Sequence, residues 1–147
     1  MKILCIEDND VKFSVIEKLL QPDNEIELIQ ARYGNEGLLK LSKDHFDLLI
    51  LDMSLPINNY SKDTNMLYGE DILAEVKRMR SRIKVFIITG FDFFEQDKER
   101  LSFEELYERL MSRYKKYLVG MVHYDQLSIE WANVLKQVIE EIKKDLV

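Results

Sequence analysis

Four apolar residues run directly into an aspartate at Leu48-Leu49-Ile50-Leu51-Asp52. A short apolar run without polar residues on either face is typical of a strand buried on both sides in a parallel sheet. Such a sheet needs helices on both faces, so this segment predicts an α/β fold. Ligands of these folds bind at the carboxyl ends of the strands, which is where Asp52 lies.

Strands and helices alternate along the rest of the chain. The pattern predicts strands at Lys2–Ile6, Ile26–Gln30, Asp47–Leu51, Lys84–Ile88 and Tyr117–Val122. Helical spacing of apolar residues predicts helices at Val11–Leu20, Asn35–Ser42, Gly69–Arg80, Ser102–Lys116, and from Asp125 or Ser128 to Leu146. Right-handed crossovers favour a doubly wound five-stranded parallel sheet, in a single domain of residues 1–147.

Three of the helices carry apolar side chains or end signals that specify their packing. In the first helix, the spaced apolar residues are Val11, Val15, Ile16, Leu19 and Leu20. In the last helix, we expect these residues to point inward: Trp131, Val134, Leu135, Val138, Ile139 and Ile142. Ser102 and Glu105 form a capping box that starts the fourth helix.

The composition excludes several classes of partner. Hydrophobic residues make up 46% and charged residues 33% of the 147 residues, and the formal net charge is −6. An acidic surface is repelled by phosphate, which argues against direct binding to nucleic acid or to an anionic membrane.

No apolar run approaches the roughly 20 residues that span a bilayer, and no secretory signal is visible. A single cysteine, Cys5, fits a reducing compartment, so we expect a cytoplasmic protein.

Three carboxylates are expected to meet at one edge of the sheet. Glu7 and Asp8 follow the first strand, Asp52 ends the third and Thr89 ends the fourth. Converging carboxylates repel one another, and a hard cation with oxygen ligands relieves that repulsion. The sequence therefore predicts a site for Mg²⁺ or Mn²⁺, with Thr89 positioned to donate to a phosphoryl oxygen.

Three segments, in order, resemble the response-regulator receiver family of two-component signalling. They are Ile3-Leu4-Cys5-Ile6-Glu7-Asp8-Asn9-Asp10, Leu48-Leu49-Ile50-Leu51-Asp52-Met53-Ser54-Leu55-Pro56 and Val85-Phe86-Ile87-Ile88-Thr89-Gly90. Each motif alone is weak, but together they cover essentially the whole chain. The resemblance implies a flavodoxin-like fold with strand order 2-1-3-4-5.

The resemblance also implies roles for individual residues. Asp52 would be the phosphoacceptor and Thr89 would hydrogen-bond the phosphoryl group. Asp8, Asp52 and the backbone carbonyl of Ser54 would ligate the metal, with Glu7 acting through a water. The chain would be a signalling domain and not an enzyme in the usual sense, with weak self-phosphorylation and self-dephosphorylation.

The same resemblance implies partners. A histidine kinase or a phosphotransfer protein would donate the phosphoryl group in a phosphorelay, and a separate downstream protein would read the signal. The face formed by the fourth helix, last strand and last helix would change shape on phosphorylation, and it is also where a homodimer would form.

The chain departs from the family at the last strand, where receivers carry a lysine followed by proline. The segment reads Tyr117-Leu118-Val119-Gly120-Met121-Val122-His123. Alignment places Gly120, Val122 or His123 at the lysine position. His123 is a weak substitute, because a histidine is cationic only near or below its pKa. Residues 53–68 and 91–116 are also long for the family, which indicates a specialised partner surface or lid.

Two other functions compete with phosphorylation. The first is a receiver-like interaction module, a pseudo-receiver, that has kept the acidic pocket and lost the switch. The second is an enzyme on a similar sheet. Dehalogenase-type phosphatases need a second aspartate where this chain has Ser54, and flavodoxin-type sites need a Ser/Thr/Gly-rich loop where it has acids. The sequence therefore opposes a phosphatase of the first type and a phosphate site of the second type.

Overall fold

The computed structural model describes residues 1–55, 68–96 and 99–147. Its main sheet contains five parallel strands in the order β2-β1-β3-β4-β7, as predicted. The strands are β1 (Lys2–Ile6), β2 (Glu27–Ala31), β3 (Leu48–Leu51), β4 (Lys84–Thr89) and β7 (Leu118–His123). Every residue of β3 is buried, because its two faces are both covered by helices.

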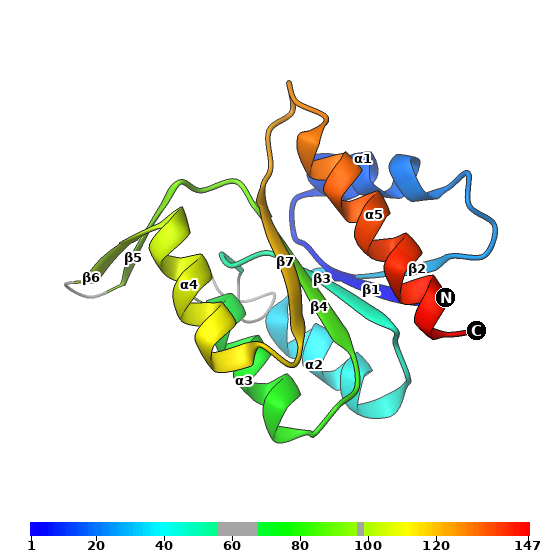
Figure 1. The fold of residues 1–147 in the computed structure, drawn as a ribbon, viewed down its shortest axis with the longest axis horizontal. Coiled ribbons are helices and arrows are strands. Elements are labelled where there is room, and N and C mark those ends of the chain that lie inside the picture. The colour runs from blue at the N-terminus through cyan, green and yellow to red at the C-terminus, as the bar shows by residue number, and fades with distance from the viewer. Residues whose placement is uncertain (56–67, 97–98) are drawn as a thin grey trace.

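Five helices cover the two faces of the sheet (Figure 1). They are α1 (Asp10–Leu20), α2 (Gly34–Lys43), α3 (Tyr68–Arg78), α4 (Phe103–Tyr114) and α5 (Glu130–Asp145). Helices α1 and α5 lie on one face, and α2, α3 and α4 lie on the other. Each face has its own apolar core, built from alternate residues of the same strands: Leu49 and Leu51 point to one side, Leu48 and Ile50 to the other.

Helix α1 buries Ile16 and Leu20 of the predicted apolar stripe, but not Val11 and Val15. Its buried residues are Lys12, Phe13, Ile16 and Leu20. Val11 and Val15, which we expected on the packed stripe, are 62% and 38% exposed. The helix is turned so that Lys12 enters the protein, since two buried carboxylates lie there to receive its ammonium group.

The C-terminal part follows the prediction with local differences. Ser102 caps α4 and forms the expected capping box with Glu105. Helix α5 starts at Glu130, later than predicted, and Val134 is 39% exposed instead of inward.

The long segment before α4 contains an antiparallel hairpin that the sequence pattern did not predict. It pairs β5 (Phe93–Gln96) with β6 (Glu99–Ser102) and projects from the molecule beside α4 (Figure 1). Phe94 is buried in the α4 side of the core, whereas Phe91 is 42% exposed. Pro56 and most of residues 53–68 lie outside the described residues.

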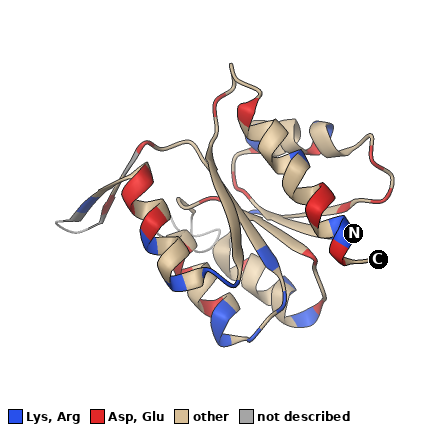
Figure 2. Cartoon of the chain, viewed as in Figure 1, with Lys and Arg blue, Asp and Glu red and all other residues tan. Residues whose placement is uncertain are grey.

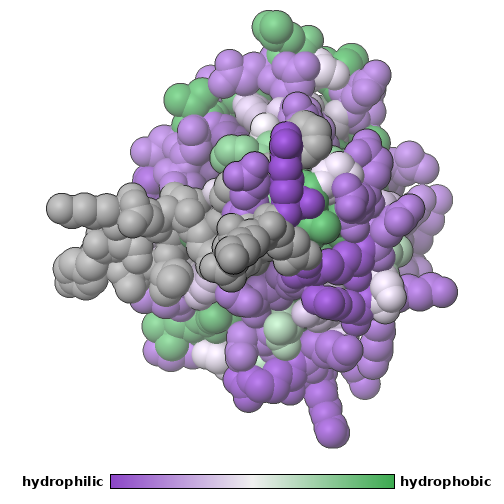
Figure 3. Space-filling model, turned by 90° about the vertical axis from the view of Figure 1, so that its left-hand side faces the viewer, coloured by the Kyte–Doolittle hydropathy of each residue, from purple (hydrophilic) through white to green (hydrophobic). Residues whose placement is uncertain are grey.

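Charged residues of both signs are spread over the helices (Figure 2). Basic residues gather toward the last turns of α2 and α3, which complements the helix dipoles. The face shown in Figure 3 is mainly hydrophilic outside the grey atoms, with hydrophobic side chains in small separate groups. Among the described residues, no helix is long and apolar enough to cross a membrane.

Candidate functional site

A pocket of about 320 Å³ lies at the carboxyl edge of the sheet. Parallel pairing of Ile6 with Leu51 puts the residues that follow them, Glu7 and Asp52, next to each other. The described residues that line the pocket are Glu7, Asp8, Asn9, Lys12, Asp52, Ser54, Gly90, Phe91, Tyr124 and Gln126. The structure thus brings together Glu7, Asp8, Asp52 and Ser54, four of the residues predicted for the site.

Lys12 is a charged residue of this pocket that the sequence pattern did not predict. Its Nζ atom lies 2.8 Å from Asp52 Oδ2, 2.7 Å from Glu7 Oε1 and 2.7 Å from the carbonyl oxygen of Ile88. These three acceptors satisfy all three N–H groups of the ammonium. Lys12 is only 6% exposed, so the contacts form inside the protein.

The start of helix α1 holds Lys12 in place. The Asn9 side chain accepts a hydrogen bond from the Lys12 backbone N–H at 3.0 Å and caps the helix. The Asn9 backbone N–H in turn donates to Glu7 Oε2 at 3.1 Å. One turn of backbone therefore positions the ammonium group and one of its carboxylate partners.

The charges of the pocket do not balance. Burial raises the pKa of Glu7 to about 7, an effect that Lys12 opposes and Asp52 reinforces. Burial also works to lower the pKa of Lys12, but Asp52 and Glu7 outweigh it and hold that pKa above its usual value. When the carboxyls of Glu7, Asp8 and Asp52 are all ionised, one ammonium leaves an excess of negative charge.

Within the described residues, the Asp52 carboxylate and the Thr89 hydroxyl can form further hydrogen bonds. Asp52 Oδ1 receives a long hydrogen bond from the Ser54 backbone N–H at 3.2 Å. Thr89 is completely buried, and its Oγ1 has no hydrogen-bond partner within the described parts of the chain. A buried hydroxyl without a partner is uncommon in native proteins and is consistent with a ligand that completes it.

The donor set suits a magnesium-type ion. Asp8 is exposed at the pocket while Asp52 is buried inside it, and both offer carboxylate oxygens. Magnesium is usually held by one or two carboxylates together with waters and phosphate oxygens, and not by a cage of protein side chains. No group of three His, Cys, Asp or Glu side chains in the described regions is arranged to hold a metal ion. The excess of carboxylate over ammonium leaves charge for a cation to neutralise.

His123 is placed apart from this group. Its Nε2 lies 3.3 Å from the Gly90 carbonyl oxygen and 3.2 Å from Asp92 Oδ1, at the rim of the sheet. Neither His123 nor Thr89 is among the described residues that line the pocket.

The last strand has little room for a side chain at Gly120. A Cβ atom there would lie 2.9 Å from Cε2 of the Phe86 ring, so Phe86 would have to move. Val122 pairs with Ile88 and packs on the α1 and α5 side of the sheet, the side on which Lys12 lies.

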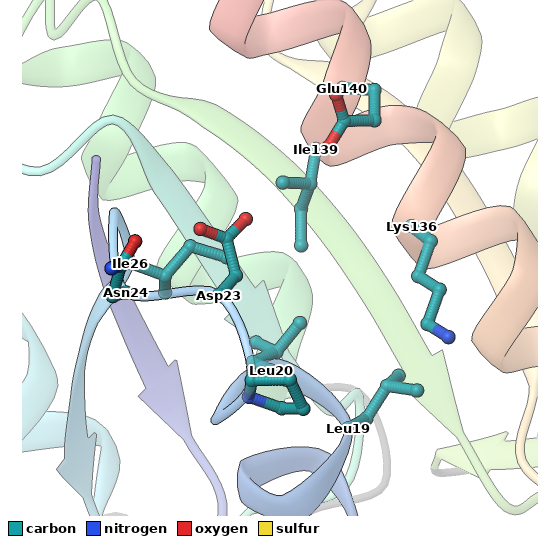
Figure 4. A pocket seen from close by; sticks show the side chains of 9 residues that line it. Leu19, Leu20, Asp23, Asn24, Ile26, Lys136, Ile139 and Glu140 are labelled. Carbon is teal, nitrogen blue, oxygen red and sulfur yellow. The ribbon is translucent and has the colours of Figure 1, made fainter.

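A larger pocket, of about 550 Å³, lies at the opposite edge of the sheet (Figure 4). It is enclosed by the end of α1, the turn before β2 and the second half of α5, and it is lined by Leu19, Leu20, Asp23, Lys136 and Glu140 among others. It shares no residue with the acidic pocket, and its mixed lining converges on no reactive group. Size therefore does not identify the site here, whereas the clustered charges do.

Comparison with known proteins places the fold. No family model matches the chain. It is 31% identical over 147 aligned positions to the uncharacterised protein y4jR of Sinorhizobium fredii, covering 92% of this chain and 95% of that protein. Among solved structures, the Francisella response regulator 1452 receiver domain matches 99% of this chain and 98% of its own, with 19% identity and a TM-score of 0.69.

Two further structures agree. A CheY-like receiver domain from Methanospirillum hungatei JF-1 covers 97% of this chain and 94% of its own, with 18% identity and a TM-score of 0.66. The response regulator TrrA of Thermotoga maritima, solved in complex with Mg²⁺ and BeF, covers 96% and 97%, with 18% identity and a TM-score of 0.65. This chain has the receiver-domain fold and belongs to the same family as y4jR.

Lys12 is a charged residue of the pocket that neither the apolar pattern nor the family resemblance selected. A lysine in the middle of Val11–Leu20 reads as a solvent-facing helix residue, so the apolar pattern gave no reason to select it. The available signal was its distance from the acidic pair, since Lys12 follows Asp8 by one helical turn and can reach back to the sheet edge.

Proposed function

We propose that this receiver-fold chain accepts a phosphoryl group on Asp52 and signals through protein–protein interaction. The observation that carries the proposal is the placement of Asp52: it is 8% exposed at the end of the central strand, inside a pocket shared with Glu7, Asp8 and Lys12. A carboxylate that lies beside potential metal ligands and an ammonium group is suited to nucleophilic attack on phosphorus.

The proposed transfer forms one bond to phosphorus and breaks one. A carboxylate oxygen of Asp52 forms a bond to the donor phosphorus, the bond from phosphorus to the leaving group breaks, and the leaving group keeps that electron pair. The carboxylate has no proton to lose. The buried Thr89 hydroxyl is a donor for an oxygen of the transferred group, which gives its unpartnered Oγ1 a role.

The proposed metal ligands are the carboxylates of Asp8 and Asp52 and the carbonyl of Ser54, with Glu7 acting through a water. Mg²⁺ or Mn²⁺ bound there would supply positive charge against the phosphoryl oxygens. The similar TrrA protein was solved in complex with Mg²⁺ and BeF, which supports the proposal of a metal site in this fold.

The proposed setting is a cytoplasmic phosphorelay. A histidine kinase or phosphotransfer protein would supply the phosphoryl group, and a separate protein would bind the modified form. The β5–β6 hairpin stands beside α4, so a partner that contacts the α4 face would also meet the hairpin.

A pseudo-receiver is the second candidate function. Lys12 already neutralises part of the carboxylate charge without any ligand, and β7 carries no lysine toward the site. An interaction module that never becomes phosphorylated would keep such a closed ion-pair network as structure alone.

Intact-mass spectrometry after incubation with acetyl phosphate separates the two functions. We expect a phosphoryl adduct on the wild type that needs Mg²⁺ and is absent from Asp52→Asn. The exposed Asp145→Asn variant is the matched control and should label like the wild type. Labelling of Asp52→Asn would remove Asp52 from the role of acceptor, and an unlabelled but folded wild type would favour the pseudo-receiver.

A further inference from the structure

We propose that Lys12 provides, from helix α1, the cation that stabilises a phosphoryl group on Asp52. The inference rests on the proposed function and assigns a role to a side chain that lies outside the motifs of the sequence. It places the positive charge on the first helix, whereas the family resemblance would place it on the last strand.

The position of Lys12 supports a direct role toward the acceptor. Its Nζ is 2.8 Å from Asp52 Oδ2, so it touches the group to be modified. Among the described residues that line the pocket, Lys12 is the one that carries a permanent positive charge. The contact to the Ile88 carbonyl at 2.7 Å anchors the ammonium to β4 and leaves the bonds to Glu7 and Asp52 free to redistribute.

The last strand does not compete for this position. Phe86 fills the space where a side chain on Gly120 would begin, and Val122 is apolar, partly buried and packed against the core of that face. Tyr124, which directly follows β7, lies with its ring centroid 5.6 Å from Lys12 Nζ. In this chain the ammonium group at this place comes from α1.

Phosphorylation strengthens the demand for that ammonium. The carboxylate of Asp52 carries one negative charge, whereas a phosphoryl group carries nearly two and offers three acceptor oxygens. A lysine that already contacts Asp52 can move one hydrogen bond from a carboxylate oxygen to a phosphoryl oxygen while it keeps its bond to the Ile88 carbonyl. Because Lys12 belongs to the first turn of α1, that shift acts on α1 and on the neighbouring Tyr124.

The test uses beryllofluoride with Mg²⁺ as a phosphoryl analogue, with affinity measured by isothermal titration calorimetry. Acetyl phosphate labelling of the same proteins is followed by intact mass. We expect Lys12→Met to weaken beryllofluoride binding roughly tenfold or more, the size of one lost charge-assisted hydrogen bond. Lys12→Arg keeps the charge and should lose less. The exposed Lys18→Met, on the same helix, is the matched control and should bind like the wild type.

Two double variants keep the test decisive. Glu7→Gln with Lys12→Met removes one buried charge of each sign, so we expect it to be more stable than Lys12→Met. It should bind more weakly than Glu7→Gln alone, which controls for the part of Glu7 in the metal site. Lys12→Met with Val122→Lys returns an ammonium to the last strand and should recover part of the affinity.

The outcomes separate this inference from the proposed function. Wild-type binding that Lys12→Met and the Glu7→Gln double variant both retain would overturn the role of Lys12 and leave the acceptor assignment standing. A folded wild type that takes neither beryllofluoride nor a phosphoryl group would overturn the proposed function, and the role of Lys12 with it.

Discussion

Lys12 Nζ and Asp52 Oδ2 form a buried ion pair, 2.8 Å apart, between the first helix and the central strand. The two residues are 40 positions apart in the chain, and each is less than a tenth exposed. The pair joins α1 to the edge of the sheet, so it contributes both to the stability of the fold and to the chemistry of the pocket.

Loss of Lys12 should destabilise the protein. Lys12→Met leaves the carboxylates of Glu7 and Asp52 buried beside each other, and breaking a buried pair on one side costs about 3 kcal/mol or more. Urea denaturation at neutral pH, in the presence of a metal chelator, measures the change. The Glu7→Gln, Lys12→Met double variant should lose less, because it removes one of the repelling charges.

Lys18→Met serves as the control and should stay within roughly 0.5 kcal/mol of the wild type, as is usual for exposed positions. If Lys12→Met were equally harmless, the ion pair would contribute nothing to folding.

Trp131 should report on the pocket. It is the only tryptophan of the chain and is buried, with its ring 5.2 Å from that of Tyr124. Tyr124 also lies over Lys12, so a shift of the ammonium changes the surroundings of the indole. We expect beryllofluoride with Mg²⁺ to change the intensity or wavelength of tryptophan emission.

The emission change should be smaller in Tyr124→Leu, because the ring that connects Lys12 to Trp131 is absent. Unchanged emission on saturation of the wild type, with binding verified by calorimetry, would show that Lys12 does not communicate with α5.

Gly69 should tolerate no side chain. A Cβ atom at this position would lie 2.7 Å from the backbone oxygen of Asp52 and 2.8 Å from the Met53 Cα, and backbone atoms cannot turn aside. We expect Gly69→Ala to lower the free energy of unfolding by about 1–3 kcal/mol, the usual effect of overpacking. Thermal and urea denaturation would both register the loss.

Gly90→Ala is the matched substitution for folding. A Cβ there meets nothing within 4 Å, and no glycine of the described residues has a positive φ. Its unfolding free energy should therefore stay near that of the wild type. Equal stability of the two alanine variants would mean that the start of α3 can move away from the Asp52 turn.

Cys5 should be inert in the folded protein. It is 1% exposed, and burial, with a smaller effect of Glu7, raises its pKa well above the ordinary value of 9.0. The thiol therefore stays protonated at pH 9, where an exposed cysteine would be half ionised, and only the thiolate reacts readily. Labelling with a thiol reagent at pH 8 to 9 should be slow in buffer and fast in urea. Rapid labelling of the native protein would show that β1 opens without global unfolding.

The sequence by itself determined the order and type of the main elements. The strands are short apolar runs, and the helices between them carry a 3.6-residue period, so a doubly wound sheet follows from local pattern and crossover handedness. The same logic located the acidic edge. Glu7 and Asp52 directly follow predicted strands, Asp8 follows Glu7, and parallel strands end together.

The tertiary structure alone decided that Lys12 joins Ile16 and Leu20 on the buried face of α1 and supplies the cation of the site. The apolar stripe favoured Val11 and Val15, but the free energy gained by pairing the Lys12 ammonium with Glu7 and Asp52 depends on where the ends of β1 and β3 lie. The same holds for Gly120, one of the three positions at which alignment places the family lysine. In the fold, a Cβ atom there would lie 2.9 Å from Cε2 of the Phe86 ring. Local patterns report the average preference of a residue, whereas a buried charge is placed by partners that are distant in the chain.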